Sequence, residues 1–442
     1  MSRANETRQV TEAVEQALSY AKAAGADAAA TASIDDGQTV ACRMQELETL
    51  EFHRSQQLSI SVFKNQCKGS ASTSDLSSRA IQETVNAALQ IARFTSEDKC
   101  TGLADADLMA TEIDDMDLYH PAEHSAEDAI ATVLACEKTA LDFDNRIDNS
   151  EGASYTGSTG TGAYGNTHGF ISAKSGTSFS LSCCVISKDD AGMQRDYWYS
   201  SERKLDQLES PADIGRKAAE RAIRRLSPRK LSTRESSVLF SADIAKTLVG
   251  HLFSALSGRA IYREASFLLN QVGKPLLPDG VDIWEEPHLK LGHNSSSYDR
   301  EGVATRQSKI IEDGRISRYL LSSYSARRLG LETTANAGGT RNVRLTHGDK
   351  SLDEMLKTMD TGLFATELIG SSVNIVNGDY SRGVSGFWVE NGEIVYPVEE
   401  LTIAGNLKDI YAGLLEIGGD IDQRGNVHTG SWLLDKLTIA GS

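Results

Sequence analysis

The sequence predicts an α+β protein, with an N-terminal region of two α+β units followed by a β-rich C-terminal domain that carries a mixed or antiparallel sheet. Segments with helical spacing of apolar residues flank strand-like segments in the first half. A stretch rich in Gly, Ser and Thr follows, and beyond about residue 280 strands alternate with long loops. The 442 residues suffice for two or three domains, which we place at 1–96, 97–230 and 231–442.

The first unit is expected to run helix, strands, helix. Residues 8–24 carry one apolar stripe, and Gly25 suits the end of that helix. Two strands are expected around DDGQ at 35–38, because Asp and Gly favour a turn. The following run LSISVF alternates apolar and polar residues as a strand does. A second helix is expected from an Asp75 cap to about Arg93.

The second unit is expected to begin after an acidic linker at 97–120. A helix at about 121–142 follows, and alternating strands are expected from Ser154 to Tyr199. The segment PADIGRKAAERAIRRL, with Pro211 near its first turn, is typical of a closing helix.

The C-terminal part is expected to begin with the short strand SSVLFS. Further along, WVENGEIVY predicts a hairpin with Asn391-Gly392 as a type I′ turn. The pentad LTIAG occurs twice, at 401–405 and 437–441, which predicts two strands in similar sheet environments.

The charge of the chain argues against nucleic-acid and membrane partners. Acidic residues outnumber basic ones by 62 to 45, and the formal net charge is −17. Such a chain has no general attraction for phosphate backbones or anionic lipids. No stretch approaches the roughly 18 apolar residues of a membrane span. The six cysteines form no C-x-x-C pair, which suits a reducing compartment. We therefore expect a cytoplasmic protein.

GTGAYG, at 160–165, matches the G-x-G-x-x-G pattern of dinucleotide sites. Such a site needs a helix directly after the pattern, because the helix N-terminus holds the pyrophosphate. The next residues, NTHGF, are typical of a turn and a strand. We expect a glycine-rich hairpin or flexible loop rather than a nucleotide site.

HPAEH, at 120–124, matches the zinc-binding order H-x-x-E-H. Two histidines four residues apart can share one helical face. Pro121 is expected to begin the helix, however, which places the first histidine at the cap. No downstream acidic ligand can be assigned either. A solvated helix start is the main interpretation, and the weak metal candidates are His120, Glu123 and His124.

The segment IAKTLVGHLFSALSG, at 244–258, predicts a helix with one histidine. His251 lies on the same side as an apolar stripe, and a lone histidine there is more often a hydrogen-bonded core residue than a metal ligand. The stripe consists of Ile244, Leu248, Leu252, Ala255 and Leu256.

The C-terminal third resembles the TldD/PmbA family, also called modulators of DNA gyrase. The resemblance rests on NGDYSRGVSGFWVENGEI and PVEELTIAGNL within 361–410. The segment SGRAIYREASFLLNQVGKPLL, at 257–277, is similar to the PmbA branch, which is also called TldE. The similarity extends over nearly the whole chain.

The resemblance implies a cytoplasmic proteolytic system with two related subunits. The TldD type carries an H-E-x-x-x-H helix and a later cysteine that hold a metal, and its glutamate is the expected general base. The PmbA type lacks that motif and associates with the TldD type. Peptides and unfolded proteins are the implied substrates.

The motif is degenerate in this chain in both possible registers. If His251 takes the place of the first histidine, then Leu252 and Leu256 occupy the glutamate and second-histidine positions. If it takes the place of the second histidine, Lys246 and Thr247 occupy the other two. No cysteine follows residue 184. We expect no catalytic residue, no metal ligand and no cofactor in this chain, and zinc or a similar divalent metal in a TldD-like partner.

Two alternatives remain at this point. The chain could act alone as a non-enzymatic regulatory or binding protein of the gyrase-modulator kind, or as a self-sufficient peptidase that uses HPAEH. A homodimer of the isolated chain is also compatible with the sequence.

Overall fold

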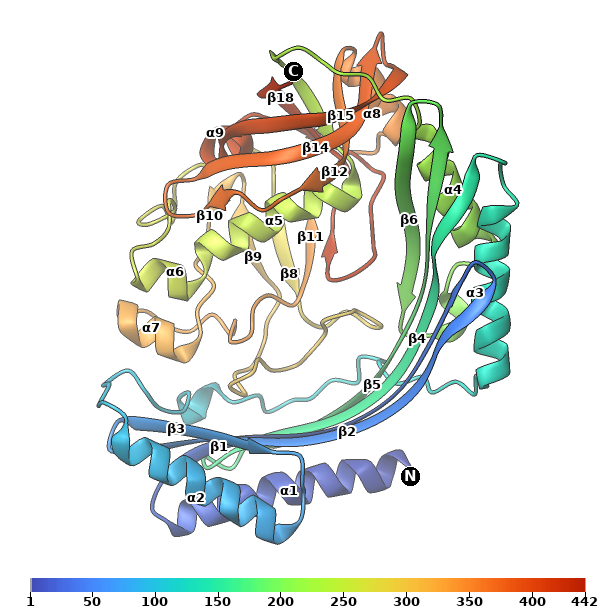
Figure 1. Ribbon diagram of the computed structural model, residues 1–442. Coiled ribbons are helices and arrows are strands. Elements are labelled where there is room, and N and C mark those ends of the chain that lie inside the picture. Colours follow the sequence, from blue (N-terminus) through green and yellow to red (C-terminus); the bar gives the residue numbers. More distant parts are fainter. Residues whose placement is uncertain (1, 442) are drawn as a thin grey trace.

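The computed structural model describes residues 2–441. Its N-terminal half is a long, strongly bent sheet, and the C-terminal half lies inside the bend (Figure 1). The sheet has six strands in the order β3-β2-β1-β4-β5-β6, and all pairings in it are antiparallel. The strands are β1 (Asp27–Arg43), β2 (Glu46–Lys64), β3 (Cys67–Thr73), β4 (Ile147–Asn166), β5 (Ile171–Asp189) and β6 (Gly192–Glu202).

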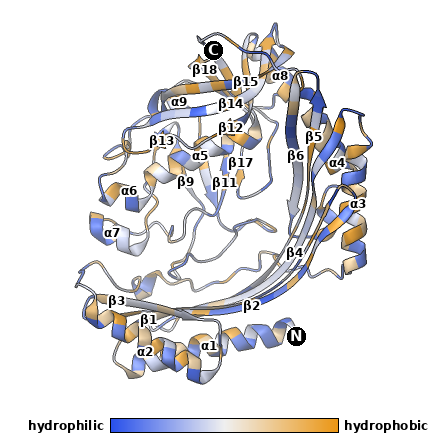
Figure 2. Cartoon of the chain, in the orientation of Figure 1, coloured by the Kyte–Doolittle hydropathy of each residue, from blue (hydrophilic) through white to orange (hydrophobic). Residues whose placement is uncertain are grey.

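Two pairs of helices cover the convex face of this sheet, one pair at each end (Figure 1). The expected apolar stripes face the sheet, and Figure 2 shows the polar residues of these helices on the outside. The first pair packs on an alanine-rich core, and the second on Phe179, Leu181 and Cys183 of β5. The helices are α1 (Arg3–Ala23), α2 (Ser78–Phe94), α3 (Ala126–Leu141) and α4 (Pro211–Arg224).

The two N-terminal sequence units share this one sheet. Strand β1 pairs with β4 from Ala29↔Asn166 to Cys42↔Ala153. The linker between the units contains only a short 3-10 helix, Ala106–Leu108, and a second one, Leu205–Gln207, follows β6. The division into 1–96, 97–230 and 231–442 stays a proposal. In it, the first two units are joined through the pairing of β1 with β4.

The expected turn at DDGQ is wrong, because these residues lie in the middle of β1. Gly37 stands opposite His53, and a Cβ there would come within 2.1 Å of the imidazole ring. Asp36 forms an ion pair with Arg54 across the strands at 3.3 Å. Cross-strand partners thus account for Asp and Gly in a strand. The turn comes later, at Met44 and the next residue, where both φ angles are positive.

Of the two interpretations of GTGAYG, the flexible loop is wrong and the glycine-rich hairpin is confirmed, because 160–165 lies in β4 and pairs with 171–176 of β5. Gly165 leaves room for helix α1, since a Cβ would come within 2.8 Å of the Val14 side chain. The turn follows at Thr167–Gly169, and strand β5 follows that turn. The helix that a dinucleotide site needs does not follow this motif.

The C-terminal half contains two further sheets, and the expected α+β class with mixed sheets is confirmed. A five-stranded sheet has the order β10-β9-β8-β11-β17. A seven-stranded sheet contains the path β12-β7-β18-β15-β14-β13, with β16 paired to β18. Pairs β7–β12 and β11–β17 are parallel and the others antiparallel. The strands are β7 (Arg234–Phe240), β8 (Ile283–Glu286), β9 (Ser308–Glu312), β10 (Arg315–Ile316), β11 (Asn342–Leu345), β12 (Gly362–Ile369), β13 (Val373–Asn374), β14 (Asp379–Glu390), β15 (Glu393–Asn406), β16 (Leu414–Ile417), β17 (Val427–His428) and β18 (Trp432–Ala440).

Both predictions about the C-terminal strands are confirmed. Asn391 and Gly392 have φ angles of 54° and 75° and join β14 to β15. The two LTIAG pentads pair with each other, with Ile403 opposite Ile439. The helices here are α5 (Ala242–Leu256), α6 (Gly258–Tyr262), α7 (Ser323–Leu329), α8 (Leu352–Met359) and α9 (Leu407–Ala412). None of the helices within residues 2–441 combines the length and the apolar composition needed to cross a membrane.

Candidate functional site

Helix α5 is the element on which the family resemblance places the metal motif. It follows β7 directly, and its inward face lies in the main C-terminal core. Leu252 and Leu256 are both 0% exposed. In the first register, the positions of the glutamate and second histidine therefore point into packed apolar residues. Neither position faces a space where water or a metal could lie.

His251 lies beside strand β14. It is half-buried, and its ring centroid is 6.1 Å from that of Tyr380. Burial and the positive charge of Arg382 lower the pKa of His251, so the imidazole is neutral at neutral pH. Three buried polar atoms here have no hydrogen-bond partner, namely Nε2 of the histidine, the tyrosine hydroxyl and Nε of the arginine. A single neutral imidazole beside a protonated phenol and a positively charged guanidinium does not form a metal site.

In the second register, Lys246 occupies the place of the first histidine. Its ammonium forms a 3.1 Å ion pair with Asp422 and a hydrogen bond to the carbonyl of Arg424. The hydroxyl of Thr247, in the glutamate position, donates to the carbonyl of Ile244. A fixed positive charge at a ligand position repels a cation, so this register does not fit a metal either.

Two histidines from segments far apart in the sequence lie near Lys246, namely His293 in a loop and His428 in β17. The pKa of His293 is lowered by burial and by the positive charges of Arg203 and Lys246. Burial also lowers the pKa of His428. The structure therefore brings together two neutral imidazoles that no sequence spacing connects. Within residues 2–441, however, no group of three His, Cys, Asp or Glu side chains converges where a metal could bind.

HPAEH does not lie on a helix, and the expected helix start at Pro121 is wrong. Helix α3 begins at Ala126, because Ser125 and Asp128 form a reciprocal capping box. His120 instead pairs with Asp117 at 3.1 Å. His124 packs against Tyr155 with centroids 4.9 Å apart, and Glu123 is exposed. The three candidates of this motif therefore lie on extended chain and do not share a helical face.

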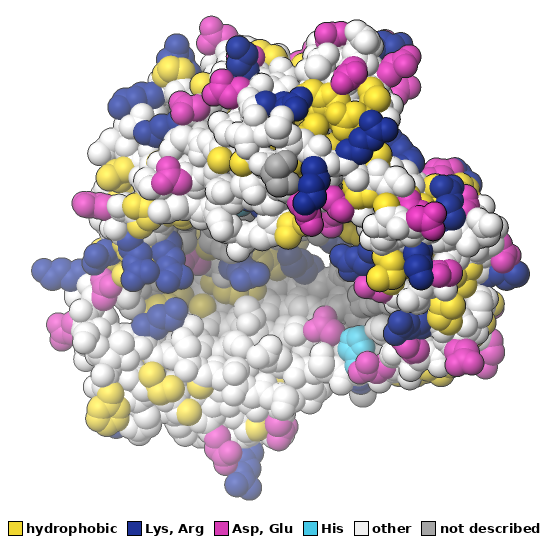
Figure 3. All heavy atoms as spheres, turned by 45° about the horizontal axis from the view of Figure 1, so that its top comes forward, with side chains coloured by type: hydrophobic (Ala, Val, Ile, Leu, Met, Phe, Trp, Pro, Cys, Tyr) yellow, Lys and Arg dark blue, Asp and Glu magenta, His cyan; other side chains and the backbone are white. Residues whose placement is uncertain are grey.

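The concave face of the six-stranded sheet is lined with small polar side chains. On β4 and β5 the cross-strand pairs Ser154–Ser182, Thr156–Ser180 and Ser158–Ser178 share this face, because the alternate residues of β5 pack against α3 and α4. Figure 3 shows a hollow between this sheet and the C-terminal half, with Lys and Arg side chains gathered along its walls.

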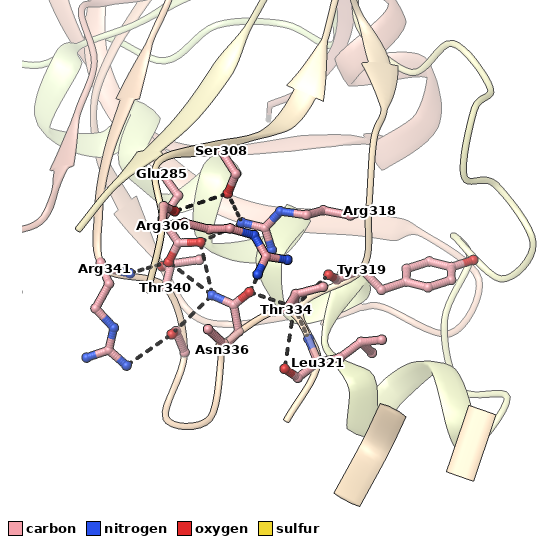
Figure 4. A network of polar contacts seen from close by, with 12 residues as sticks. Glu285, Arg306, Ser308, Arg318, Tyr319, Leu321, Thr334, Asn336, Thr340 and Arg341 are labelled. Carbon is pink, nitrogen blue, oxygen red and sulfur yellow. Dashed lines mark hydrogen bonds and ion pairs between the residues drawn. The ribbon is translucent and has the colours of Figure 1, made fainter. Parts of the chain in front are cut away.

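Loops of the C-terminal half that face the sheet are held by a buried polar network (Figure 4). Glu285 is 3% exposed and accepts from Nη2 of Arg318 at 2.6 Å. The same carboxylate accepts from the amide of Asn336 and from the backbone N–H of Arg341. One carboxylate thus fixes loops around residues 318 and 336–341.

Lys174 is a residue of this hollow that motif reasoning missed. It is exposed on the concave side of β5, and its ammonium lies 3.2 Å from the hydroxyl of Ser296 in the C-terminal half. A sequence signal existed, because Lys174 is the only Asp, Glu, Lys or Arg between Glu151 and Lys188. The residues that surround Lys174 are far away in the sequence, so this signal did not predict what the lysine could bind.

Comparison with known proteins covers nearly the whole chain. Three family models match in order: PmbA/TldA metallopeptidase domain 1 at 33–92, the central domain at 119–226 and the C-terminal domain at 233–441. The metalloprotease PmbA of Escherichia coli O157:H7 is 46% identical over 430 residues, which are 97% of this chain and 96% of that protein.

Solved structures agree on the fold. A Bacteroides thetaiotaomicron protein named as a modulator of DNA gyrase has a TM-score of 0.93 at 26% identity and matches over 98% of both chains. TldE from Thermococcus kodakarensis has a TM-score of 0.85 at 19% identity, covering 97% of this chain and 100% of that one, which shows a shared fold only. Identity along nearly the full length, together with the three family domains in order, shows that this chain belongs to the PmbA/TldD metallopeptidase family.

Proposed function

We propose that this chain is the non-catalytic, PmbA/TldE-type subunit of a cytoplasmic peptidase complex that degrades or processes peptides and unfolded proteins. A TldD-like subunit would hold the zinc or similar divalent metal. The observation that carries the proposal is the burial of Leu252 and Leu256 in the core. Those residues do not fit a metal, and no step of hydrolysis is assigned to this chain.

The role of the chain in such a complex would be to enclose and hold the substrate. The concave face offers hydroxyl groups along β4 and β5 and few large side chains. An extended peptide can also pair with a free strand edge through backbone hydrogen bonds, which tolerate any sequence. Strand β6 ends the six-stranded sheet and has such an edge. A proline in β6 at a position whose backbone N–H faces away from β5, for example Met193→Pro, should then weaken peptide binding.

The test is metal content and hydrolysis of an unfolded protein such as casein, measured for the chain alone, for a TldD-like partner alone and for the mixture. We expect a metal-free, inactive chain that increases cleavage by the partner. A chain that alone contains one zinc per molecule and cleaves casein would refute the proposal, and His124→Ala would then test HPAEH. A mixture no better than the partner alone would favour the stand-alone regulatory role.

A further inference from the structure

The cavity next to Lys174 is bounded by both halves of the molecule. It has a volume of about 290 Å³. One wall is β5, from which the lysine projects, and another is the serine run Ser295–Ser297 with Tyr298. The ammonium lies 5.6 Å from the centroid of the Tyr298 ring. Residues 113–119 of the inter-unit linker close the third side.

The ammonium in this cavity lacks a negative counterpart. In residues 2–441 no carboxylate lies within ion-pair distance of Lys174. Surrounding protein, and then the positive charges of Arg341, Arg203 and Arg300, lower the pKa of Lys174 to about 8. In a chain of net charge −17, such an uncompensated cluster of cations is unusual.

Three aspartates line the cavity, and two of them have basic neighbours other than Lys174. Asp114 faces His288 at 3.8 Å, and Asp117 pairs with His120 at 3.1 Å and with Lys204 at 3.5 Å. The third, Asp115, accepts from the backbone N–H of Asp117, and within the described residues none of the three lies within ion-pair distance of Lys174.

The guanidinium of Arg341 is also left without a carboxylate. Glu285, its neighbour, is taken up by Arg318, Asn336 and the backbone of residue 341 itself. Figure 4 shows the Arg341 side chain directed away from Glu285. Its Nη2 reaches only backbone carbonyls, including that of Ala337, and its buried Nε has no partner. The backbone N–H of Arg300 donates to the same Ala337 carbonyl, so the two arginines lie on adjoining loops.

We propose that Lys174, with the positive field of Arg300 and Arg341 behind it, forms a carboxylate-binding subsite in the hollow between the sheet and the C-terminal half. The inference rests on the proposed function in that the carboxylate belongs to a peptide, either at its C-terminus or on an Asp or Glu side chain. The ammonium forms a charge-assisted hydrogen bond to the carboxylate. The hydroxyl of Ser297, which accepts from the backbone N–H of Asp114, donates its proton to the second oxygen. The subsite binds and orients a peptide end and carries out no covalent step.

The experiment measures fluorescence anisotropy of three dansyl-labelled heptapeptides with the full chain. The first is an alanine-serine peptide with a free C-terminus, the second its C-terminal amide, and the third the same amide with two internal glutamates. The variants are Lys174→Met, which removes the charge, and Lys174→Arg, which keeps it. Lys188→Met is the matched control, because that lysine is exposed near the far end of the same strand and forms no side-chain contact within the described residues.

We expect Lys174→Met to weaken binding of a carboxylate-bearing peptide by about tenfold, the size of one charge-assisted hydrogen bond. Lys174→Arg and Lys188→Met should stay within about twofold. If amidation costs affinity in the wild type but not in Lys174→Met, the carboxylate is the peptide terminus. If only the glutamates matter, and only while Lys174 is present, it is a side chain.

Three results would overturn the subsite. The wild type could bind all three peptides with equal affinity, Lys174→Met could weaken all three equally, or no peptide could bind. The proposed function is judged separately, from stimulation of casein cleavage in the mixture with the partner. A Lys174→Met chain that still stimulates the partner would leave that function standing.

Discussion

Helix α5 and strand β5 are opposite cases of what a family scaffold can keep. The motif positions of the helix point into packed apolar core, where Leu252 and Leu256 are inaccessible to water. The strand presents Lys174 to a cavity, with its charge uncompensated. Helix α5 lies where the resemblance places a metal motif but has apolar residues there. Strand β5 carries a charged lysine that belongs to no recognised motif. The difference teaches that apolar packing at one element does not prevent a polar, charged cavity at another element of the same chain.

Restoring the motif on α5 should have the largest effect. The double variant Leu252→Glu/Leu256→His buries a carboxylate and an imidazole without partners, which should destabilise the protein by more than about 4 kcal/mol. Urea unfolding and zinc analysis measure the result. Leu252→Met, which conserves volume, should cost less than about 1.5 kcal/mol. A stable double variant that takes up zinc would contradict the conclusion that these two positions of α5 cannot hold a metal.

A buried charge with all its partners present gives the next largest effect. Glu137 is 0% exposed and accepts hydrogen bonds from the backbone N–H groups of Met44 and Gln45, at the turn between β1 and β2. Glu137→Leu leaves these donors unpaired and should cost about 2–4 kcal/mol in urea unfolding. Glu137→Asp, which keeps the charge on a shorter side chain, is the matched control and should cost less.

The same residue predicts a pH dependence. Burial alone would raise the pKa of Glu137, but hydrogen bonds from Gln45, Ser150 and Met44 outweigh it, and the net shift is downward. The stabilisation is therefore complete above the ordinary glutamate pKa of about 4.3 and is lost as pH falls through the lower folded value. The wild-type minus Glu137→Leu difference in unfolding free energy should shrink in acid, and a difference independent of pH would contradict this.

Arg424 connects the region of α5 to the bent sheet and should have an intermediate effect. Its guanidinium lies 4.0 Å from the ring centroid of Trp198 and 4.5 Å from that of Tyr199, and it forms two hydrogen bonds to Asp422. Arg424→Ala should lower stability by about 1–2 kcal/mol, because Lys246 still pairs with the aspartate. Arg424→Lys, which keeps the charge without the planar fork, should recover part of the loss. Thermal unfolding with tryptophan fluorescence provides the measurement.

Lys174 should have the smallest effect on stability. Its pKa falls to about 8 in the folded chain, below the ordinary lysine value of about 10.4. Between these values the unfolded chain binds more protons, so this residue makes stability rise with pH. Lys174→Met should flatten the pH dependence of unfolding in that window, while Lys188→Met should not. The change is small because the side chain is still partly open to solvent, which screens the surrounding charges. A steeper dependence in Lys174→Met would contradict the uncompensated charge.

Periodicity predicted the elements well wherever one face is buried by local packing. The stripe of α1 from Val10 to Ala21 and the alternation of Leu58, Ile60 and Val62 are buried as expected. Turn chemistry misled at DDGQ, since cross-strand partners override local preference. At GTGAYG it left a hairpin and a loop open, and the structure has the hairpin. The resemblance located α5, and the spacing of its apolar stripe correctly placed Leu252 and Leu256 in the core. The spacing did not show that His251 is half-buried with its Nε2 unpartnered.

The carboxylate subsite could not be read from the sequence, because its parts come from distant segments. Lys174 and Ser296 are 122 positions apart, and Arg341 is further still. The absence of a counter-charge depends on how Glu285 is shared among three partners, which only the fold determines. Composition signalled a lone lysine in a serine-rich strand and nothing more.

The hydroxyl-lined concave face repeats every two residues along β4 and β5. A chain lying on such a surface meets nearly the same groups after a shift of one repeat, so neighbouring positions have nearly equal energies. Such a face would therefore offer an extended chain several binding positions of similar energy rather than one specific position. Selection of a position along it falls to the few features that break the repeat, of which the charge at Lys174 is one.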